Sequence, residues 1–133
     1  MEIINLELLN LITTKAKESP RLRMNYNFHK SPESKAQILL NAMEPGTRLL
    51  IHRHKNTSET YILLKGSLKV LFYSENHELL SCYELNPANG AYGVAIPAGQ
   101  WHTVEVLETG TVIFEVKEGP YTPITGEDTL TLI

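Results

Sequence analysis

Four potential metal ligands occur in this sequence, and the first three have spacings that suit two adjoining β-strands. Gly46 is followed after five residues by His52, and the run continues as His52-x-His54, four residues, Glu59, six residues and Gly66. Side chains two residues apart leave the same face of a strand, so the two histidines would project together. A hairpin after His54 would bring Glu59 back beside the two imidazoles.

A second cluster, Pro97-x-Gly99-x-x-His102, follows later in the chain and contributes the third imidazole. Pro-x-Gly is typical of a turn, so His102 would begin a further strand. Each element alone is common on protein surfaces, and only their combination indicates a site. Three imidazoles and one carboxylate suit zinc, iron, manganese or nickel, so the ligand set does not distinguish among these metals. The sequence predicts one divalent metal ion bound by His52, His54, Glu59 and His102.

Short segments of alternating apolar residues, separated by Gly, Pro and Asn, fill the chain after residue 20. Leucines and isoleucines at helical spacing over residues 2–18 predict one amphipathic helix, which Pro20 ends and which packs on the outside. Many short strands with regular turns indicate an all-β sandwich or barrel. The strands are predicted at about residues 22–28, 36–43, 48–54, 60–64, 68–73, 79–85, 93–96, 102–107 and 111–116.

The composition is that of one ordinary globular domain. The chain has 133 residues, 42% hydrophobic and 20% charged, with a formal net charge of -3. This charge, without a basic stripe, argues against nucleic acid as a partner, and no apolar run is long enough to cross a bilayer. Glu2 and Glu7 argue against a secretory leader, so we expect a cytoplasmic location. The single cysteine, Cys82, lies in an alternating segment and is expected to be a buried structural thiol.

The run that ends at Gly66 resembles the first sequence motif of the cupin superfamily, and the run that ends at His102 resembles the core of the second. Ala91 stands where the motif has glycine, and Val106 stands where asparagine is frequent; neither position is a ligand. The resemblance implies an all-β fold, a single cupin barrel (double-stranded β-helix or jelly roll) with one N-terminal α-helix. It implies one domain over residues 1–133, with the helix in 1–19, the barrel in 20–123 and an irregular tail in 124–133.

Further segments carry a narrower resemblance. They are Arg-x-Asn-x-Asn-Phe-His at 23–29, Leu-Asn-Ala at 40–42, His-Arg-His at 52–54, Trp-His at 101–102 and Phe-Glu-Val-Lys-x-Gly-Pro-Tyr at 114–121. Together they resemble the WbuC family of cupin-fold metalloproteins, which occurs among bacterial surface-polysaccharide genes. This resemblance implies a fold and a metal, but it does not imply a substrate.

Polar side chains share one face of the strand predicted at 22–28. An arginine there would bind a carboxylate or phosphate if the face lines the barrel mouth, whereas a face turned to solvent needs no function. With polar residues of two further strands, the candidate ligand-binding residues are Arg23, Asn25, Asn27, Gln37, Asn41 and Lys117. The candidates for proton transfer are Glu115, Tyr61 and His29. Equally, Glu115 and Lys117 could be a solvated pair, and Tyr61 a barrel-filling aromatic.

These features favour a metalloenzyme that acts on a small polar or sugar-derived molecule by isomerase, epimerase or lyase chemistry. The sugar element rests on the family resemblance alone. Two alternatives stay open: a non-catalytic cupin that binds or senses a sugar or carboxylate, and an Fe(II)-dependent dioxygenase. Four protein ligands would close a tetrahedral zinc site, whereas an octahedral iron or manganese would keep two open positions.

The strand at 22–28 also bears on assembly. An uncovered apolar face on an edge strand tends to associate, so we expect either a homodimer or the N-terminal helix to cover it. The apolar residues of this face are Leu22, Met24, Tyr26 and Phe28.

Overall fold

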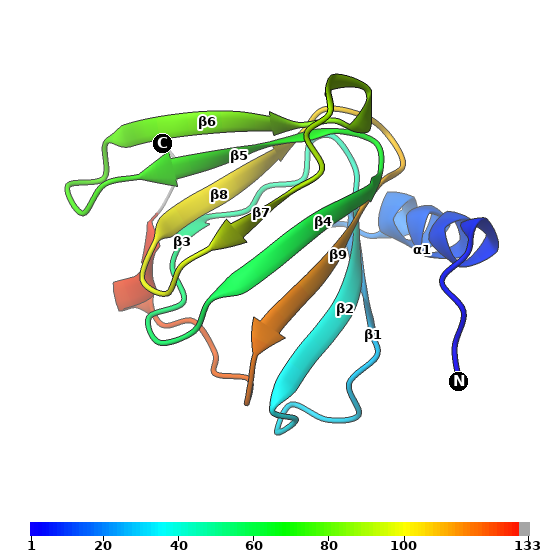
Figure 1. Ribbon diagram of the computed structural model, residues 1–133, viewed down its shortest axis with the longest axis horizontal. Helices are drawn as coiled ribbons and strands as arrows, with labels where there is room; N and C mark the ends of the chain where they lie inside the picture. The colour runs from blue at the N-terminus through cyan, green and yellow to red at the C-terminus, as the bar shows by residue number, and fades with distance from the viewer. Residues whose placement is uncertain (131–133) are drawn as a thin grey trace.

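The alternating segments form two antiparallel sheets of five strands each, which face each other in the computed structural model of the chain (Figure 1). The structure describes residues 1–130. In chain order the elements are α1 (Leu6–Glu18), β1 (Arg23–Asn27), β2 (Ala36–Met43), β3 (Ile51–His52), β4 (Glu59–Lys65), β5 (Leu68–Tyr73), β6 (Leu79–Leu85), η1 (Pro87–Asn89), β7 (Gly93–Ile96), β8 (Trp101–Val106), β9 (Thr111–Glu118), η2 (Gly126–Asp128) and β10 (Thr129–Leu130). One sheet has the order β1-β2-β9-β4-β7, the other β10-β3-β8-β5-β6. The predicted bounds of β2, β5, β6 and β7 are confirmed.

The N-terminal helix packs on the outer face of the first sheet, against β1, β2 and β9. It begins later than predicted because the Asn5 side chain accepts a hydrogen bond from the Leu8 N–H at 2.9 Å and caps it. Its buried face is Leu9, Ile12 and Ala16. None of the helices within residues 1–130 has both the length and the apolar character that crossing a membrane would require.

The helix also covers the apolar face of β1. Met24, Tyr26 and Phe28 pack against the buried residues of α1 and of β2. Of the two expected covers for this face, the structure therefore shows the helix. A homodimer is a separate prediction, because nothing in the fold now requires a second copy at this position.

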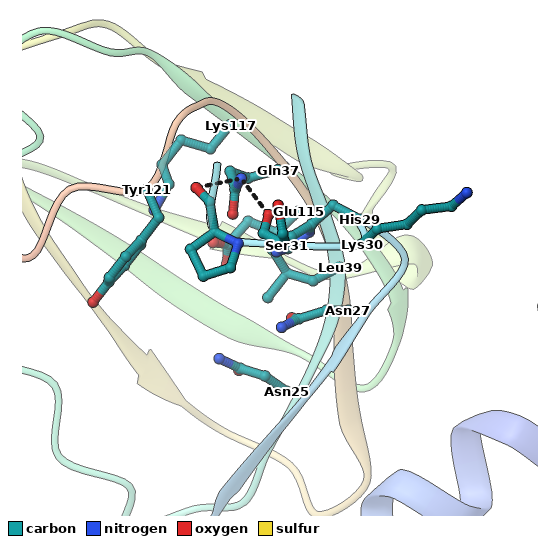
Figure 2. Close-up of a pocket in the computed structure, with 11 residues that line it drawn as sticks. Asn25, Asn27, His29, Lys30, Ser31, Gln37, Leu39, Glu115, Lys117 and Tyr121 are labelled. Carbon is teal, nitrogen blue, oxygen red and sulfur yellow. Dashed lines mark hydrogen bonds between the residues drawn. The ribbon is translucent and has the colours of Figure 1, made fainter. Parts of the chain in front are cut away.

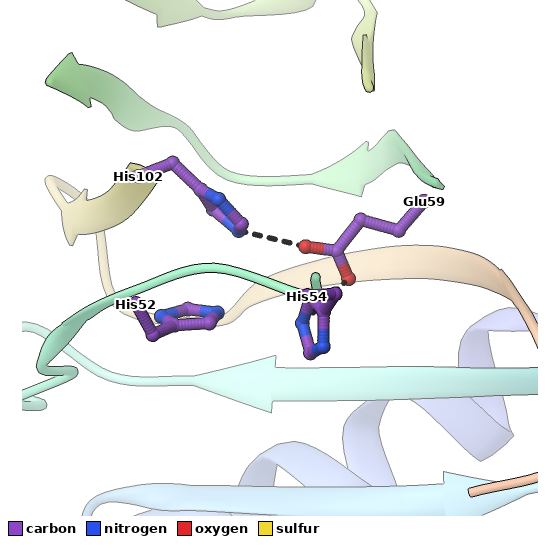
Figure 3. Close-up of side chains that lie close together, drawn as sticks. All are labelled: His52, His54, Glu59 and His102. Carbon is purple, nitrogen blue, oxygen red and sulfur yellow. Dashed lines mark ion pairs between the residues drawn. The ribbon is translucent and has the colours of Figure 1, made fainter. Parts of the chain in front are cut away.

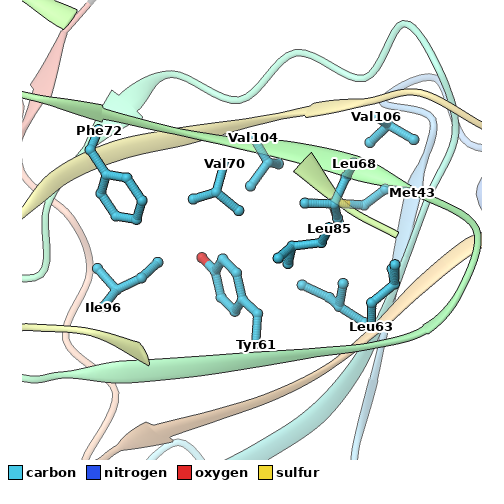
Figure 4. Packing of buried hydrophobic residues seen from close by; sticks show 11 residues of the cluster. Met43, Tyr61, Leu63, Leu68, Val70, Phe72, Leu85, Ile96, Val104 and Val106 are labelled. Carbon is cyan, nitrogen blue, oxygen red and sulfur yellow. The ribbon is translucent and has the colours of Figure 1, made fainter. Parts of the chain in front are cut away.

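Apolar side chains from both sheets fill the space between them (Figure 4). Fully burying one such side chain contributes about 1.5–3 kcal/mol relative to leaving it exposed. Because this cluster is built from apolar groups and one tyrosine, we expect the barrel to fold without a metal ion. Its buried members are Met43, Tyr61, Leu63, Leu68, Val70, Phe72, Leu85, Ile96, Val104, Val106 and Ile113.

Steric constraints explain why the last residue of the first motif is glycine. Gly66 has a φ of +85°, which L side chains rarely adopt, and it joins β4 to β5. A Cβ on this residue would lie 2.2 Å from the Thr111 hydroxyl oxygen and 2.7 Å from the Thr111 Cα. The motif therefore requires glycine here for backbone geometry as well as for packing.

Three expectations are corrected by the structure. The strand predicted over 48–54 is only Ile51–His52, so His54 lies in the following loop, and Leu50, which strand alternation would turn inward, is 49% exposed. Cys82 is exposed rather than buried. β6 is the edge strand of its sheet, and within this strand Leu85 alone is buried.

The tail expected to be irregular over 124–133 is partly ordered. It contains η2 and the two-residue strand β10, in which Thr129 pairs with His52 and Leu130 with Ile51. The Asp128 carboxylate lies 2.7 Å from Nε of Arg53, which holds the segment against the barrel. Residues 131–133 lie outside the described residues.

Candidate metal centre and adjoining cavity

Four side chains from three strands and one loop converge on one point inside the barrel (Figure 3). His52 comes from β3, Glu59 begins β4 and His102 lies on β8, while His54 reaches the same place from the loop after β3. Their ligand atoms all lie within 4.8 Å of one another. The predicted ligand set is therefore brought together, although only one of the two early histidines is on a strand. The expected hairpin is wrong, because β3 and β4 lie in different sheets and Glu59 reaches the imidazoles from the facing sheet.

The backbone sets the orientation of two imidazoles. Nδ1–H of His52 donates to the Leu50 carbonyl at 2.9 Å, and Nδ1–H of His102 donates to the Gln100 carbonyl at 2.8 Å. Metal-binding histidines commonly donate one ring N–H in this way, which leaves the Nε2 lone pair for the ion. The donor set, its convergence and these two anchors fit a divalent metal.

Glu59 lies at the centre of the cluster. Its Oε1 is 2.7 Å from Nε2 of His102, and its Oε2 is 3.5 Å from Nε2 of His54. The hydroxyl of Tyr61 donates to Oε1 at 2.9 Å. The Glu59 carboxylate therefore contacts two of the imidazoles and the tyrosine hydroxyl.

The burial of the cluster favours the protonation states that metal binding needs. Burial, and then the nearby His102, lower the pKa of His52 to about 4. Burial also lowers the pKa of His54. Burial alone would raise the pKa of Glu59, but the hydrogen bond and charge of His102 outweigh it and hold that pKa below its usual range. At neutral pH the centre therefore offers neutral His52 and His54 beside an ionised carboxylate.

A cavity of about 400 Å³ opens on the inner side of β1, β2 and β9 (Figure 2). Much of its lining can donate or accept hydrogen bonds. It is lined by Asn25, Asn27, His29, Lys30, Ser31, Pro32, Gln37, Leu39, Glu115, Lys117 and Tyr121.

The cavity and the carboxylate of the histidine cluster lie on neighbouring strands of one sheet. In the pairing of β4 with β9, Tyr61 is opposite Glu115 and Glu59 is opposite Lys117. Residues directly opposite in a sheet project from the same face. Glu115 and Lys117 therefore stand between the cavity and the histidine cluster.

Glu115 has the unusual electrostatics of a buried carboxyl group beside another. Burial, and then the negative charge of Glu59, raise the pKa of Glu115 to about 7, against the opposing effects of Lys117 and of a hydrogen bond from Asn41. A group with this pKa exchanges protons readily at neutral pH, and such groups are concentrated at functional sites.

Some of the other predicted site residues line the cavity, and others do not. Asn25, Asn27, His29, Gln37 and Lys117 line the cavity with Glu115. The Gln37 amide is engaged, since its Nε2–H donates to the Ser34 carbonyl at 2.9 Å. Nδ1 of His29 is tied to the backbone of Ile38 and does not join the metal cluster.

Arg23, Asn41 and Tyr61 fall outside the cavity lining. Arg23 lies at the other end of β1, where its Nη1 donates to the Arg48 carbonyl at 3.2 Å, and Asn41 has a buried Oδ1 with no hydrogen-bond partner among the described residues. Tyr61 is 6% exposed and packs in the core, and its hydroxyl donates to Glu59 of the histidine cluster.

Two features were missed in the sequence. Tyr121 lines the cavity, and Nζ of Lys117 lies over its ring, 5.8 Å from the ring centroid. Arg53, next to two histidines, pairs with Asp128 and lies over the Trp101 ring at 4.7 Å. Only the Gly-Pro-Tyr segment in the family resemblance pointed to Tyr121, and no local pattern pairs Arg53 with a residue in the tail.

Solved structures with a similar fold confirm the cupin architecture. A cupin 2 domain-containing protein from Halorhodospira halophila has a TM-score of 0.61 at 13% identity, covering 77% of this chain and 68% of its own. The Cnp3 cupin domain of Schizosaccharomyces pombe has a TM-score of 0.58 at 10% identity, covering 72% and 64%. At these identities the likeness concerns the fold alone.

The capsular polysaccharide assembling protein CapF from Staphylococcus aureus has a TM-score of 0.58 at 21% identity. The match covers 78% of this chain and 29% of the CapF chain, so this chain spans less than a third of that protein. No curated protein matches the sequence. One family model matches residues 4–85, more than half of the chain, and its description is a domain of unknown function. The chain therefore belongs to the DUF6016 family.

Proposed function

We propose that this chain is a metal-dependent enzyme of the cupin fold that acts on a small sugar or sugar-derived carboxylate by isomerase, epimerase or lyase chemistry. The observation that carries the proposal is the position of Glu115, between the histidine cluster and the 400 Å³ cavity. A bound divalent metal would supply a Lewis acid that polarises a carbonyl or hydroxyl oxygen of the substrate. His52, His54, Glu59 and His102 would hold that ion.

The cavity residues suit a polar substrate. Lys117 provides a positive charge for a carboxylate, and Asn25 and Asn27 provide amide groups for hydroxyls. Glu115 would accept or return the proton of a substrate C–H group, since its pKa of about 7 makes both forms available. Tyr61 is less suited to this role because its hydroxyl already donates to Glu59.

Two likenesses support a sugar as the substrate class. The segments at 23–29 and 114–121 resemble the WbuC family, which is found among surface-polysaccharide genes, and both segments contribute residues to the cavity. The fold is similar to that of CapF, a capsular polysaccharide assembling protein. We therefore propose a WbuC-like role in the metabolism of surface sugars.

Solvent exchange tests this proposal without knowledge of the product. Metal-loaded protein in D₂O is incubated with a panel of aldoses, uronic acids and nucleotide sugars, and proton NMR follows the loss of substrate C–H signals. We expect metal-dependent exchange for at least one compound, and a loss of about 100-fold or more in Glu115→Gln. The rate should rise with pH through about 7, because the base must be ionised to accept a proton.

Glu105→Gln is the matched control, since Glu105 is an exposed carboxylate on β8. Its exchange rate and metal content should equal those of the wild type. Equal rates in Glu115→Gln and the wild type would remove Glu115 from the chemistry. Tight binding of a panel compound without metal-dependent exchange would favour the non-catalytic alternative.

A further inference from the structure

Three arginines surround a second cleft, at the end of β1 that is remote from the cavity. The cleft has a volume of about 310 Å³, and no acidic residue lines it. Within residues 1–130, none of its arginines forms an ion pair. Three uncompensated cations stand out in a chain whose net charge is -3. The cleft is lined by Pro20, Arg21, Leu22, Arg23, Gly46 and Arg48.

Hydrogen bonds fix the backbone around this cleft. Leu22 has a φ of +58°, in the left-handed region that costs a residue with a side chain on the order of 1 kcal/mol. Its carbonyl accepts hydrogen bonds from the Glu44 N–H at 2.8 Å and from the Thr47 hydroxyl at 3.1 Å. The same hydroxyl donates to the Arg21 carbonyl at 2.7 Å. These contacts hold the backbone of the first two arginines against the loop that carries the third.

Arg23 is the innermost of the three. It is partly buried, and its Nη1 donates to the Arg48 carbonyl at 3.2 Å, which leaves its other N–H groups for a further partner. Burial, and then the positive charge of Arg21, lower the pKa of Arg23. The cluster thus accumulates like charge, and an anion bound among the three side chains would relieve the repulsion.

We propose that Arg21, Arg23 and Arg48 bind a phosphate or diphosphate group. A guanidinium matches phosphate oxygens bidentately. Three of them balance a multiply charged phosphate better than a single carboxylate. The group would be either free phosphate or the phosphate of an ester. The lining of this cleft shares no residue with the histidine cluster or with the cavity, so the site does not depend on either.

Isothermal titration of the metal-free protein at constant ionic strength tests the site. The probes are inorganic phosphate, pyrophosphate, glucose 1-phosphate, uridine diphosphate and malonate. We expect pyrophosphate to bind, with an affinity at least ten-fold lower in the double variant Arg21→Gln/Arg48→Gln. Both residues are exposed, so the variant should fold as the wild type does. Tighter binding of the two esters than of free phosphate would identify a phosphorylated metabolite as the source.

Lys15→Gln/Lys17→Gln is the control, since it removes two charges from the exposed side of α1. It should leave the affinity for pyrophosphate unchanged. The proposal is overturned if neither phosphate nor any ester binds, if the two double variants weaken binding equally, or if malonate binds as tightly as pyrophosphate. Failure of the exchange experiment on Glu115 would leave this result untouched.

Discussion

The variant His54→Ala is expected to contain less than about a tenth of the metal found in the wild type. Removing a direct ligand should cost more than the 10- to 100-fold in affinity that is typical of outer-shell substitutions. The fold should persist, because His54 lies in a loop and its side chain is 14% exposed, so its removal leaves no buried cavity in the core. Elemental analysis gives the metal content, and circular dichroism melting curves of the metal-free proteins give the stability.

His77→Asn is the control for this experiment. His77 lies in the turn between β5 and β6 with a φ of +66°, a conformation that asparagine tolerates. Its metal content should match that of the wild type. A wild-type metal content in His54→Ala would show that the residue is not a ligand, and metal loss in both variants would indicate adventitious binding to histidines.

The variant Glu59→Ala is expected to lower the free energy of unfolding of the metal-free protein by about 3 kcal/mol. Glu59 and His102 form a buried pair at 2.7 Å, with exposures of only 3% and 1%. Removing the carboxylate leaves the ring nitrogen of His102 buried without a hydrogen-bond partner, which typically costs about 1–3 kcal/mol. Tyr61 would also lose its acceptor. Urea unfolding in the presence of a chelator measures the loss.

Glu105→Ala removes an exposed carboxylate from β8 and should change the stability by less than about 0.5 kcal/mol. If Glu59→Ala were as stable as this control, the contact between Glu59 and His102 would not hold the metal-free centre together. Retained metal binding in Glu59→Ala would in addition remove the carboxylate from the ligand set.

Much of the fold and of the metal cluster could be predicted because the deciding information is local. Alternation locates β5, since its buried residues Leu68, Val70 and Phe72 stand at every second position. The motif spacing identifies His52, Glu59 and His102 as a set, but a hairpin does not bring them together: His52 pairs with His102 in one sheet, and Glu59 faces them from the other. Gly66 is required by its φ and by Thr111, and both effects act at one turn.

The remaining features depend on contacts between distant segments. Cys82 has the pattern of a buried residue, but β6 is an edge strand, and strand order cannot be read from alternation. Alternation places Arg23 on the same strand face as Asn25 and so predicts one common binding site. Arg23 instead donates to the Arg48 carbonyl and lines a different cleft. The pairing of Arg53 with Asp128 joins residues separated by most of the barrel sequence.

X-ray diffraction at an absorption edge would show directly whether His52, His54, Glu59 and His102 bind one metal ion. The protein would be purified without an affinity metal column and analysed for its elements before crystals are grown. We expect one anomalous peak per chain, about 2.0–2.3 Å from Nε2 of His52, His54 and His102 and from a carboxylate oxygen of Glu59. A protein that takes up no metal, or a peak bound by other residues with these four side chains turned away, would show that they do not form a metal centre.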